Sequence, residues 1–395
     1  MSVSPDERRA ILDRTRALKM ARSVHAYVRG NTAQFYEWLE NSSVAELIPS
    51  GPAIWICGDC HLGNLGPLAD ADRRVDIQIR DLDQAVIGNP AHDLIRLGLS
   101  LETAARSADL PGVTTARMIE AMIDGYSQAL GRTEGKHPME PAVVRSVRRK
   151  ALGRRWHHLA RERLEDVEPK IPYGKRFWKL TDREWDAIEA LFGQPEIVTR
   201  ALDLAGLEKG SIRVIDAAYW RKGCSSLGKL RYAVILGVKA KGGKRERLAL
   251  VDIKEAVPSV APVDAGARMP DDPAERVVAG ARALAPNLGE RMIPAQLLSK
   301  PVVLRELTPQ DLKIEVEQFS RREAIAAAEY LAYIVGLAHA HQMPRDQRHM
   351  WSDRLTRRPD GKLDAPSWLW RSVVILAGKH EAGYLDHCRR FALET

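Results

Sequence analysis

The sequence predicts an α+β fold in which helical segments at both ends flank a strand-rich middle. Apolar residues recur at helical spacing from residue 7 to 48 and again from residue 325 to 338, whereas strand-forming residues concentrate between about residues 211 and 307. The chain has 395 residues and 45% hydrophobic content, so it can bury a sizeable core. We therefore expect two lobes. The predicted divisions are residues 1–205 and 311–395, which form a larger helical lobe, and residues 206–310, which form a smaller antiparallel β lobe.

The first expected elements surround an acidic loop. A short apolar run predicts a strand at Ile54–Cys57, and the loop after it reads Cys57-Gly58-Asp59-Cys60-His61-Leu62-Gly63-Asn64. The period-2 pattern of Val75–Ile79 predicts a half-buried strand that ends just before Asp81 and Asp83. An Asp five residues before an Asn, with a second acid at a strand end, is the layout that phosphoryl transfer needs. Asp59 would orient a hydroxyl, Asn64 and Asp81 would hold Mg²⁺, and Asp83 would be a second metal contact.

Helices are expected after this acidic loop. The sequence Gly88-Asn89-Pro90 breaks the chain, and apolar residues then fall at helical spacing up to Ala105. Asp93 lies near the start of this helix, where an N-cap is expected. Within the preceding loop, His61 is expected to brace the chain through a hydrogen bond. Further helices are expected over residues 114–206.

The strand-rich middle predicts three consecutive strands. Two of them enclose a glycine-containing loop, and the third, Leu248–Ala256, carries Lys254 near its end. The loop would lay backbone N–H groups over phosphates, and Lys254 would pair their oxygens. Glu275 on the next helix would hold this lysine by an ion pair, and Glu255 and Glu290 are the alternatives for this acid. A further strand is expected at Pro301–Leu307. The residues expected to bind the nucleotide are Gly223, Ser225, Ser226, Gly228, Lys254, Glu275, Glu306 and Leu307.

Two short motifs in these loops admit other interpretations. Cys57-x-x-Cys60-His61 fits the pattern of haem attachment, but that attachment ordinarily requires export. The same residues could belong to a zinc site, but no second Cys or His pair supplies the remaining ligands. Gly223–Lys229 nearly fits a P-loop, yet Leu230 stands where a magnesium-binding hydroxyl is required and a strand follows where a helix is required. A plain hairpin turn without a ligand is the alternative for this second loop.

The net charge of +8 favours an anionic ligand such as a nucleotide. Acidic residues are interspersed in the most basic stretch, and no series of aromatic residues accompanies it, so nucleic-acid binding is not favoured. The members of this stretch are Arg145, Arg148, Arg149, Lys150, Arg154, Arg155, Arg161 and Arg163.

Location and redox state can be predicted from two further features. No apolar run approaches the roughly 20 residues that span a bilayer, and the first residues contain no apolar signal core, so we expect a cytoplasmic protein without a membrane partner. The four cysteines are too few and too scattered for a secreted disulfide scaffold, so they are expected to be reduced thiols.

The acidic motifs resemble those of known phosphotransferases. Three segments are similar to catalytic and metal motifs of aminoglycoside phosphotransferases and choline kinases. They are Gly58-Asp59-x-His61-x-x-Asn64, Asp81-Leu82-Asp83 and Asn89-Pro90-x-x-Asp93-Leu94. More closely, nearly the whole chain resembles a bacterial family catalogued as domain of unknown function 2252. This resemblance implies a bilobal, protein-kinase-like fold with an ATP site, and no particular substrate. Its segments are Tyr27-x-Arg29-Gly30, Lys254-Glu255-Ala256, Arg276-Val277-Val278-x-Gly280, Leu304-Arg305-Glu306-Leu307, Leu337-Ala338-x-Ala340-His341 and His380-Glu381-Ala382-Gly383-Tyr384.

The order of these parts implies a circular permutation. A usual kinase runs from its small lobe through a hinge and a long helix to the catalytic loop, whereas here the catalytic loop precedes the small lobe. The strand Arg305–Leu307 would be the hinge, and the helix through Leu331 and His341 would be the one that ordinarily precedes the catalytic loop. Permutation keeps the contacts and moves only the termini. It predicts that Lys254 and Asp81 face one cleft.

The sequence as a whole predicts a phosphotransferase that depends on ATP and Mg²⁺. It would transfer a phosphoryl group to a hydroxyl or amine of an unidentified acceptor, either a small molecule or a protein. Asp59 and Lys254 are its expected catalytic residues. Two alternatives use the same residues: a nucleotide-binding regulatory module with little turnover, and an AMP transferase.

Overall fold

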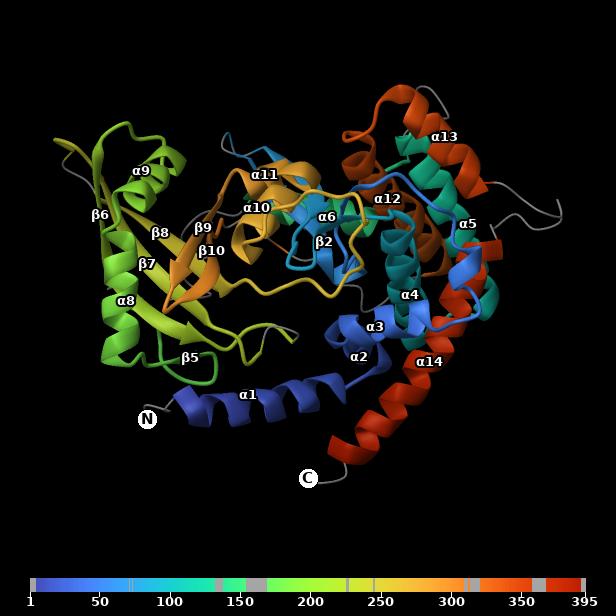
Figure 1. Ribbon diagram of the computed structural model, residues 1–395, viewed down its shortest axis with the longest axis horizontal. Coiled ribbons are helices and arrows are strands. Elements are labelled where there is room, and N and C mark those ends of the chain that lie inside the picture. The colour runs from blue at the N-terminus through green and yellow to red at the C-terminus, as the bar shows by residue number, and fades with distance from the viewer. Residues whose placement is uncertain are drawn as a thin grey trace.

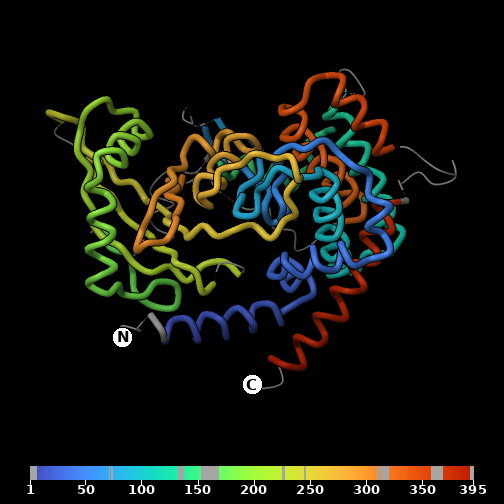
Figure 2. Tube along the Cα trace, viewed as in Figure 1, coloured from blue at the N-terminus to red at the C-terminus, as the bar shows by residue number. Residues whose placement is uncertain are grey.

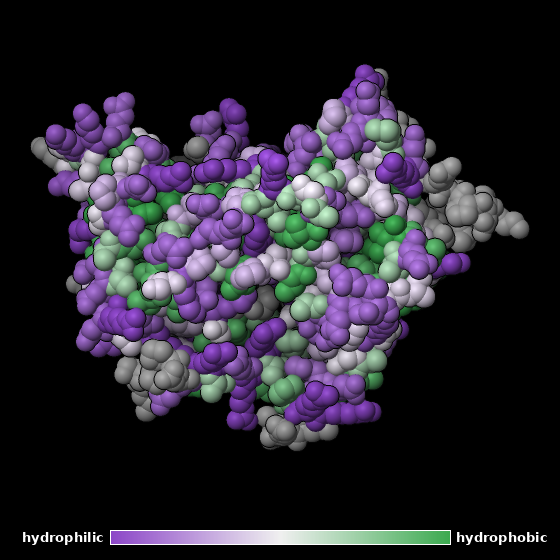
Figure 3. All heavy atoms as spheres, in the orientation of Figure 1, coloured by the Kyte–Doolittle hydropathy of each residue, from purple (hydrophilic) through white to green (hydrophobic). Residues whose placement is uncertain are grey.

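A computed structural model confirms an α+β architecture with a β-rich part and a helical part. Figure 1 shows the largest sheet on one side of the molecule and most of the helices on the other. Hydrophilic side chains cover much of the face in Figure 3, with smaller apolar areas between them. The described residues are 5–70, 72, 74–131, 138–153, 169–224, 227–243, 246–308, 312, 320–356 and 367–391.

Six antiparallel strands form the main sheet, in the order β5-β6-β7-β8-β10-β9. Its middle strand β7 is buried from Arg231 to Val238 because both faces of the sheet are covered. Arg231 lies opposite Lys254 in the register, and Asp252 lies opposite Arg305, so these four charged residues share one face. The strands are β5 (Phe177–Trp178), β6 (Gly210–Trp220), β7 (Arg231–Ala240), β8 (Glu246–Glu255), β9 (Met292–Leu297) and β10 (Lys300–Glu306).

Helices α8 (Asp182–Phe192) and α9 (Pro195–Leu204) cover the opposite face of this sheet. Ile188 and Leu202, one from each helix, share an apolar cluster with Tyr232 and Val234 of β7. Since side chains alternate along β7, this is the face away from Arg231. The predicted division at residue 206 therefore separates these two helices from the sheet on which they pack.

Helix α1 (Pro5–Met20) also contacts the β-rich part. Its Leu12 belongs to the same apolar cluster, and the buried Arg8 Nη1 lies 2.6 Å from Glu184 Oε1 of α8. In Figure 1 this helix runs along one edge of the molecule from the sheet toward the helical part. The first predicted helix is thus present. It packs on the β-rich part, and the chain then continues into the helical part.

The helical part is held together by close helix packing. A Cβ at Gly125 of α5 would lie 2.1 Å from the carbonyl oxygen of Glu329 in α12, so glycine permits the two backbones to touch. The long helix predicted through Leu331 is confirmed as α12. The helices of this part are α2 (Val24–Gly30), α3 (Thr32–Glu40), α4 (Ala91–Ser107), α5 (Gly112–Ala129), α6 (Ala142–Gly153), α12 (Arg321–Ala340), α13 (Arg345–Thr356) and α14 (Ser367–Phe391), with the 3₁₀ turn η1 (Ala45–Leu47).

Two small antiparallel sheets carry the acidic motifs. Strand β1 (Ile54–Ile56) pairs with β4 (Val86–Gly88), and β2 (Leu65–Ala69) pairs with β3 (Val75–Ile79). The short turn η2 (Leu62–Asn64) leads into β2. The predicted strands before Asp59 and before Asp81 are therefore confirmed, and pairing of the flanking strands holds both acidic segments at one end of these sheets.

The connection from β8 to β9 passes through α10 (Pro273–Leu284) and α11 (Pro286–Gly289). Helix α10 is capped by Asp272, whose Oδ1 accepts a hydrogen bond from the Ala274 N–H at 2.7 Å. Its apolar face, including Val277 and Ala281, joins the core of the helical part. This helix therefore links the sheet to the segments that carry the acidic motifs.

The first and last described helices contact each other. The Tyr384 hydroxyl of α14 donates to the Ala21 carbonyl at 3.0 Å, and His387 Nε2 lies 2.8 Å from the Ala17 carbonyl oxygen. Figure 2 shows the end of α14 approaching the end of α1. Among the helices of the described ranges, none combines the length and apolarity needed to cross a membrane.

Candidate functional site

The loop after β1 is fixed by a glycine and by two buried side chains. Gly58 has φ +69°, and a Cβ there would lie 2.3 Å from the carbonyl oxygen of Gln84, so only glycine fits without displacement. The Tyr36 hydroxyl donates to the Gly58 carbonyl at 2.7 Å. The carboxylate of Asp93 accepts hydrogen bonds from the N–H groups of Cys57 at 2.7 Å and Gly58 at 2.9 Å. These contacts hold the loop in one conformation.

Asp93 belongs to a buried polar network that reaches across the helical part. Its Oδ2 lies 3.2 Å from His339 Nε2, and His339 Nδ1 lies 2.8 Å from the Tyr126 hydroxyl. The indole N–H of Trp351 donates to that hydroxyl at 3.2 Å. The interpretation of Asp93 as an N-cap is wrong, because Pro90 holds that position and the Asp93 carboxylate instead binds the loop at Cys57 and Gly58.

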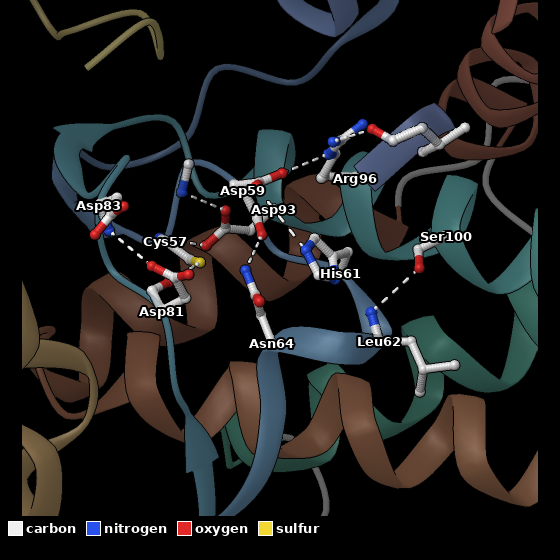
Figure 4. Close-up of polar contacts among 12 residues, drawn as sticks. Cys57, Asp59, His61, Leu62, Asn64, Asp81, Asp83, Asp93, Arg96 and Ser100 are labelled. Carbon is white, nitrogen blue, oxygen red and sulfur yellow. Dashed lines mark hydrogen bonds and ion pairs between the residues drawn. The ribbon is translucent and has the colours of Figure 1, made fainter. Parts of the chain in front are cut away.

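Asp59 is oriented by an arginine from the next helix. Arg96, completely buried in α4, donates from Nε to Asp59 Oδ1 at 2.9 Å and from Nη2 to the Val28 carbonyl at 2.7 Å. Figure 4 shows this pair beside Asn64 and His61. Burial raises the pKa of the Asp59 carboxyl, while the positive charge of Arg96 opposes that shift. A carboxylate fixed through one oxygen can use the other to accept a proton.

Asn64 and His61 lie on the same loop as Asp59. Asn64 Nδ2 donates to the Asp59 carbonyl at 3.0 Å, which leaves its Oδ1 to face another partner. Burial and the charge of Arg29 hold the pKa of His61 well below its usual range, so its imidazole is neutral. The prediction that His61 braces the loop by a side-chain hydrogen bond is wrong: Nδ1 is buried without a partner, and Nε2 lies 3.9 Å from Asp59 Oδ2.

Lys254 reaches from β8 to both acids that follow β3. Its Nζ lies 3.2 Å from Asp81 Oδ1 and also forms an ion pair with Asp83. Burial alone would raise the pKa of Asp81, but the positive charge of Lys254 outweighs it and lowers this pKa. The pKa of Asp83 is raised, because Asp83 is buried and lies beside the negative charge of Asp81. The predicted proximity of Lys254 and Asp81 is confirmed.

Glu275 does not reach Lys254. Its side chain is exposed in the first turn of α10, where its backbone N–H donates a hydrogen bond to Oδ1 of the capping Asp272 at 3.0 Å. The next residue, Arg276, points inward and donates from Nη2 to the carbonyls of Asp83 at 2.8 Å and Val257 at 2.9 Å. Helix α10 therefore contributes an arginine that fixes the Asp83 backbone, and no acid that pairs with Lys254.

Four of the residues predicted to bind the nucleotide, Gly223, Gly228, Glu306 and Leu307, lie in or next to strands of the main sheet. Gly223 and Gly228 both have φ +93°, and the Gly223 carbonyl accepts a hydrogen bond from Lys19 at 2.9 Å. Ser225 and Ser226 lie outside the described residues. Glu306 ends β10, and the buried Leu307 donates its N–H to the Leu250 carbonyl at 2.8 Å.

A cavity of about 380 Å³ brings the two halves of the candidate site together. It is lined by Asp59, Asn64 and Asp81 from the acidic segments and by Gly223 from the loop after β6. A smaller adjoining cavity of about 60 Å³ is lined by Asp81, Asp83 and Lys254 among others. Six predicted site residues from separate parts of the sequence thus line these two cavities: Asp59, Asn64, Asp81, Asp83, Gly223 and Lys254.

The cysteines of the C-x-x-C-H motif are not presented for covalent attachment. Cys57 and Cys60 are both completely buried in the core. Their mutual hydrogen bond and burial raise the pKa of Cys57, which keeps this thiol protonated. Within the described ranges, no three side chains of His, Cys, Asp or Glu approach one another as a preformed metal-binding group.

Comparison with known proteins gives the family. Residues 8–390 match the family described as "Uncharacterized protein conserved in bacteria (DUF2252)". The chain belongs to this family. Comparisons with curated proteins and with solved structures found no match. The match covers the acidic loop, the sheet and the helical part alike, so the residues of the site described above lie within the matched range.

Proposed function

We propose that this DUF2252 protein is an ATP- and Mg²⁺-dependent phosphotransferase. The observation that carries the proposal is the position of Lys254, whose Nζ lies 3.2 Å from Asp81 Oδ1 at the border of the cavity that also holds Asp59 and Asn64. Phosphoryl transfer requires a lysine that pairs phosphate oxygens, an Asp and an Asn that bind the metal, and an acid that receives the hydroxyl proton.

The oxygen atoms near the cavity suit a magnesium ion. The Asp81 side chain is 45% exposed, so its carboxylate is accessible to a hard cation, and Asn64 uses its amide nitrogen for the Asp59 carbonyl, which leaves Oδ1 for a ligand. Mg²⁺ commonly takes one or two protein oxygens together with phosphate oxygens and water. When bound, it would neutralise charge on the transferred phosphoryl group. Lys254 would then pair phosphate oxygens, and its present contacts with Asp81 and Asp83 keep it beside them.

Asp59 would receive the proton of the acceptor. Arg96 holds Oδ1, so Oδ2 is the oxygen directed to the acceptor hydroxyl. The hydroxyl oxygen would form a bond to the γ-phosphorus as the bond from that phosphorus to the β,γ-bridging oxygen breaks. ADP leaves, and the hydroxyl proton passes to Asp59. The raised pKa of this carboxyl, caused by burial, favours its role as a proton acceptor.

The arrangement also supports a kinase-like, circularly permuted fold. Lys254 lies on the third strand of the β6-β7-β8 series, and α10 follows that strand. Gln342, just after α12, accepts from the Trp55 N–H at 2.8 Å and donates to the Trp55 carbonyl at 3.0 Å. The end of α12 therefore lies beside the start of the catalytic loop segment, although the two are far apart in the sequence. This is the contact that a permuted kinase would keep.

Measuring ADP release tests the proposal. Wild type should release ADP from ATP in the presence of Mg²⁺ and an acceptor. The activity of Asp59→Asn should be lower by at least about 100-fold, although this variant should still bind ATP. The control Asp186→Asn, which changes an exposed residue, should be as active as wild type. Mass spectrometry of the acceptor distinguishes a transferred phosphate from AMP. Equal ADP release by Asp59→Asn would overturn the assigned role of Asp59, and ATP binding without turnover would favour a regulatory module.

A further inference from the structure

One wall of the 380 Å³ cavity is strongly basic. Lys19 from the end of α1, Arg22 from the turn after it and Arg29 from α2 line it together with Asp59 and His61. These three cations lie close together in sequence and approach the acidic loop from the side of the first helices. The basic wall, as we call Lys19, Arg22 and Arg29, is the part of the cavity that the chemistry proposed above does not use.

Arg29, a member of the basic wall, lies against the acidic loop. A Cβ at Gly63 would lie 2.9 Å from both Cζ and Nη2 of Arg29, so the absence of a side chain at Gly63 allows the guanidinium to lie against the loop. Its Nε is buried without a hydrogen-bond partner. The neighbouring His61, only 4% exposed, also has a buried Nδ1 without a partner. Two side chains that line the cavity thus each carry a buried nitrogen without a hydrogen-bond partner.

The basic wall lacks acidic partners, whereas other cations near the cavity have them. Arg231 pairs with Asp252 at 2.5 Å, Arg96 with Asp59 at 2.9 Å, and Lys254 with Asp81 at 3.2 Å. Among the described residues, no carboxylate lies within ion-pair distance of Lys19, Arg22 or Arg29, and the Lys19 contact is with a neutral carbonyl. The charge of Arg29 also helps to lower the pKa of His61. An anion in the cavity would meet uncompensated positive charge here.

The basic wall is separate from the side that would hold the nucleotide. In the view of Figure 4, Asp59 and Asn64 lie between the Asp81–Asp83 segment and His61. Lys254 contacts the first of these sides, and Arg29 lies against Gly63 on the second. A ligand that reaches from Arg29 to Asp59 would therefore approach the acid from the side opposite Lys254.

We infer that the acceptor is a small anionic molecule, whose phosphate or carboxylate group is bound by Arg29 with Lys19 and Arg22 while its hydroxyl lies at Asp59. The inference rests on the proposed phosphotransfer for the role of the hydroxyl. A guanidinium binds such groups through two parallel hydrogen bonds, which fixes their orientation as well as their position. Arg29 would in this way position the hydroxyl for transfer of the γ-phosphoryl group and would not itself contact the reacting atoms.

Calorimetric titration of the nucleotide-free protein tests the anion site. The probes are glycerol 3-phosphate, glucose 6-phosphate and citrate, each at low ionic strength, with glycerol and glucose as uncharged counterparts. Wild type should bind at least one anion and neither neutral compound, and Arg29→Met should weaken that binding at least tenfold. Arg117→Met, which removes one exposed charge from α5, should bind as wild type does. A second variant, Gly63→Ala, keeps the charge but displaces the guanidinium, and it should weaken binding similarly.

The outcomes separate this inference from the proposed function. Failure of every anion to bind, or equal binding by wild type and Arg29→Met, overturns the inference even if MgATP binds. If anion binding depends on Arg29 but the protein neither binds nor hydrolyses ATP, the anion site is supported and the phosphotransfer proposal is overturned. Citrate binding without binding of either phosphate ester would identify the recognised group as a carboxylate, and the reverse would identify it as a phosphate.

Discussion

Lys254 Nζ and Asp81 Oδ1 lie 3.2 Å apart, although 173 residues separate them in the sequence. The contact joins the main sheet to the segment after β3, and Lys254 pairs with Asp83 at the same point. Because the two acids come from the helical part and the lysine comes from the sheet, this ion-pair group connects the two halves of the candidate site. Its surroundings lead to the predictions below.

Gly58→Ala should destabilise the protein much more than Gly131→Ala. Both glycines have positive φ, +69° and +86°, which costs about 1–2 kcal/mol for alanine. At Gly58 the new Cβ would also lie 2.3 Å from a backbone oxygen, whereas Gly131 has open space. Urea unfolding should show a loss of more than about 3 kcal/mol for Gly58→Ala and about 1 kcal/mol for Gly131→Ala. Equal losses would mean that the loop is not held against Gln84.

Asp93→Asn should cost about 2–4 kcal/mol of unfolding free energy. Asparagine has one acceptor oxygen in place of two, so it cannot serve both the Cys57 and Gly58 N–H groups while it also faces His339. Tyr36→Phe removes a single hydrogen bond to the same loop and should cost about 1 kcal/mol. Denaturant unfolding of both variants measures the difference. A change below about 1 kcal/mol in Asp93→Asn would contradict the anchoring role of the carboxylate.

Arg276→Met should destabilise the segment around Asp83. The guanidinium donates to the carbonyls of Asp83, Ala85 and Val257, and these buried acceptors would lose their partner. We expect a loss of about 2–4 kcal/mol, measured by thermal or urea unfolding. Arg282→Met, on the exposed side of the same helix, is the matched control and should change stability by less than about 0.5 kcal/mol.

The buried carboxyl of Glu102 should make the free energy of unfolding depend on pH. Burial raises its pKa to about 7, although Arg106 Nε, 3.5 Å away, opposes the shift. The folded state therefore binds this proton more tightly than the unfolded state, whose pKa is near 4.5, and stability falls as pH rises from about 4.5 to 7. Glu102→Gln removes this loss. Relative to wild type, the variant should gain about 2 kcal/mol over that window, less than the full shift because the group is partly solvated.

The matched control for this pH series is Glu189→Gln, which neutralises an exposed carboxylate on α8. Its stability relative to wild type should stay constant to within about 0.5 kcal/mol between pH 4.5 and 7. A flat profile for Glu102→Gln as well would show that the Glu102 carboxyl titrates normally in the folded protein.

Local patterns in the sequence predict much of the fold. The alternation in Val75–Ile79 and the strand formers around Lys254 correspond to β3 and β8, because pairing and one-sided burial follow the same period. The packing of α8 and α9 on the sheet could not be predicted in this way. Their apolar faces would suit either part of the molecule, and only tertiary contacts decide which one they cover.

The candidate site was predictable in its acids and its lysine, but not in the residues that orient them. Arg96 gives little local signal, since a charged residue in a helix is ordinarily assigned to the solvent side. The signal available was its position three residues after Asp93, on a helix whose surrounding residues are nearly all apolar. The role of Arg276 is likewise not evident beside Glu275, because the sequence does not show which of two adjacent charged residues points inward.

Binding of MgATP, measured by calorimetry, tests the central claim most directly. The account predicts that wild type binds MgATP, that Asp59→Asn retains this binding, and that Lys254→Met weakens it at least tenfold. Lys300→Met, which removes an exposed lysine from the neighbouring strand β10, should bind as wild type does. Absence of nucleotide binding in wild type, or undiminished binding by Lys254→Met, would contradict the assignment of Lys254 and Asp81 to a phosphotransferase site.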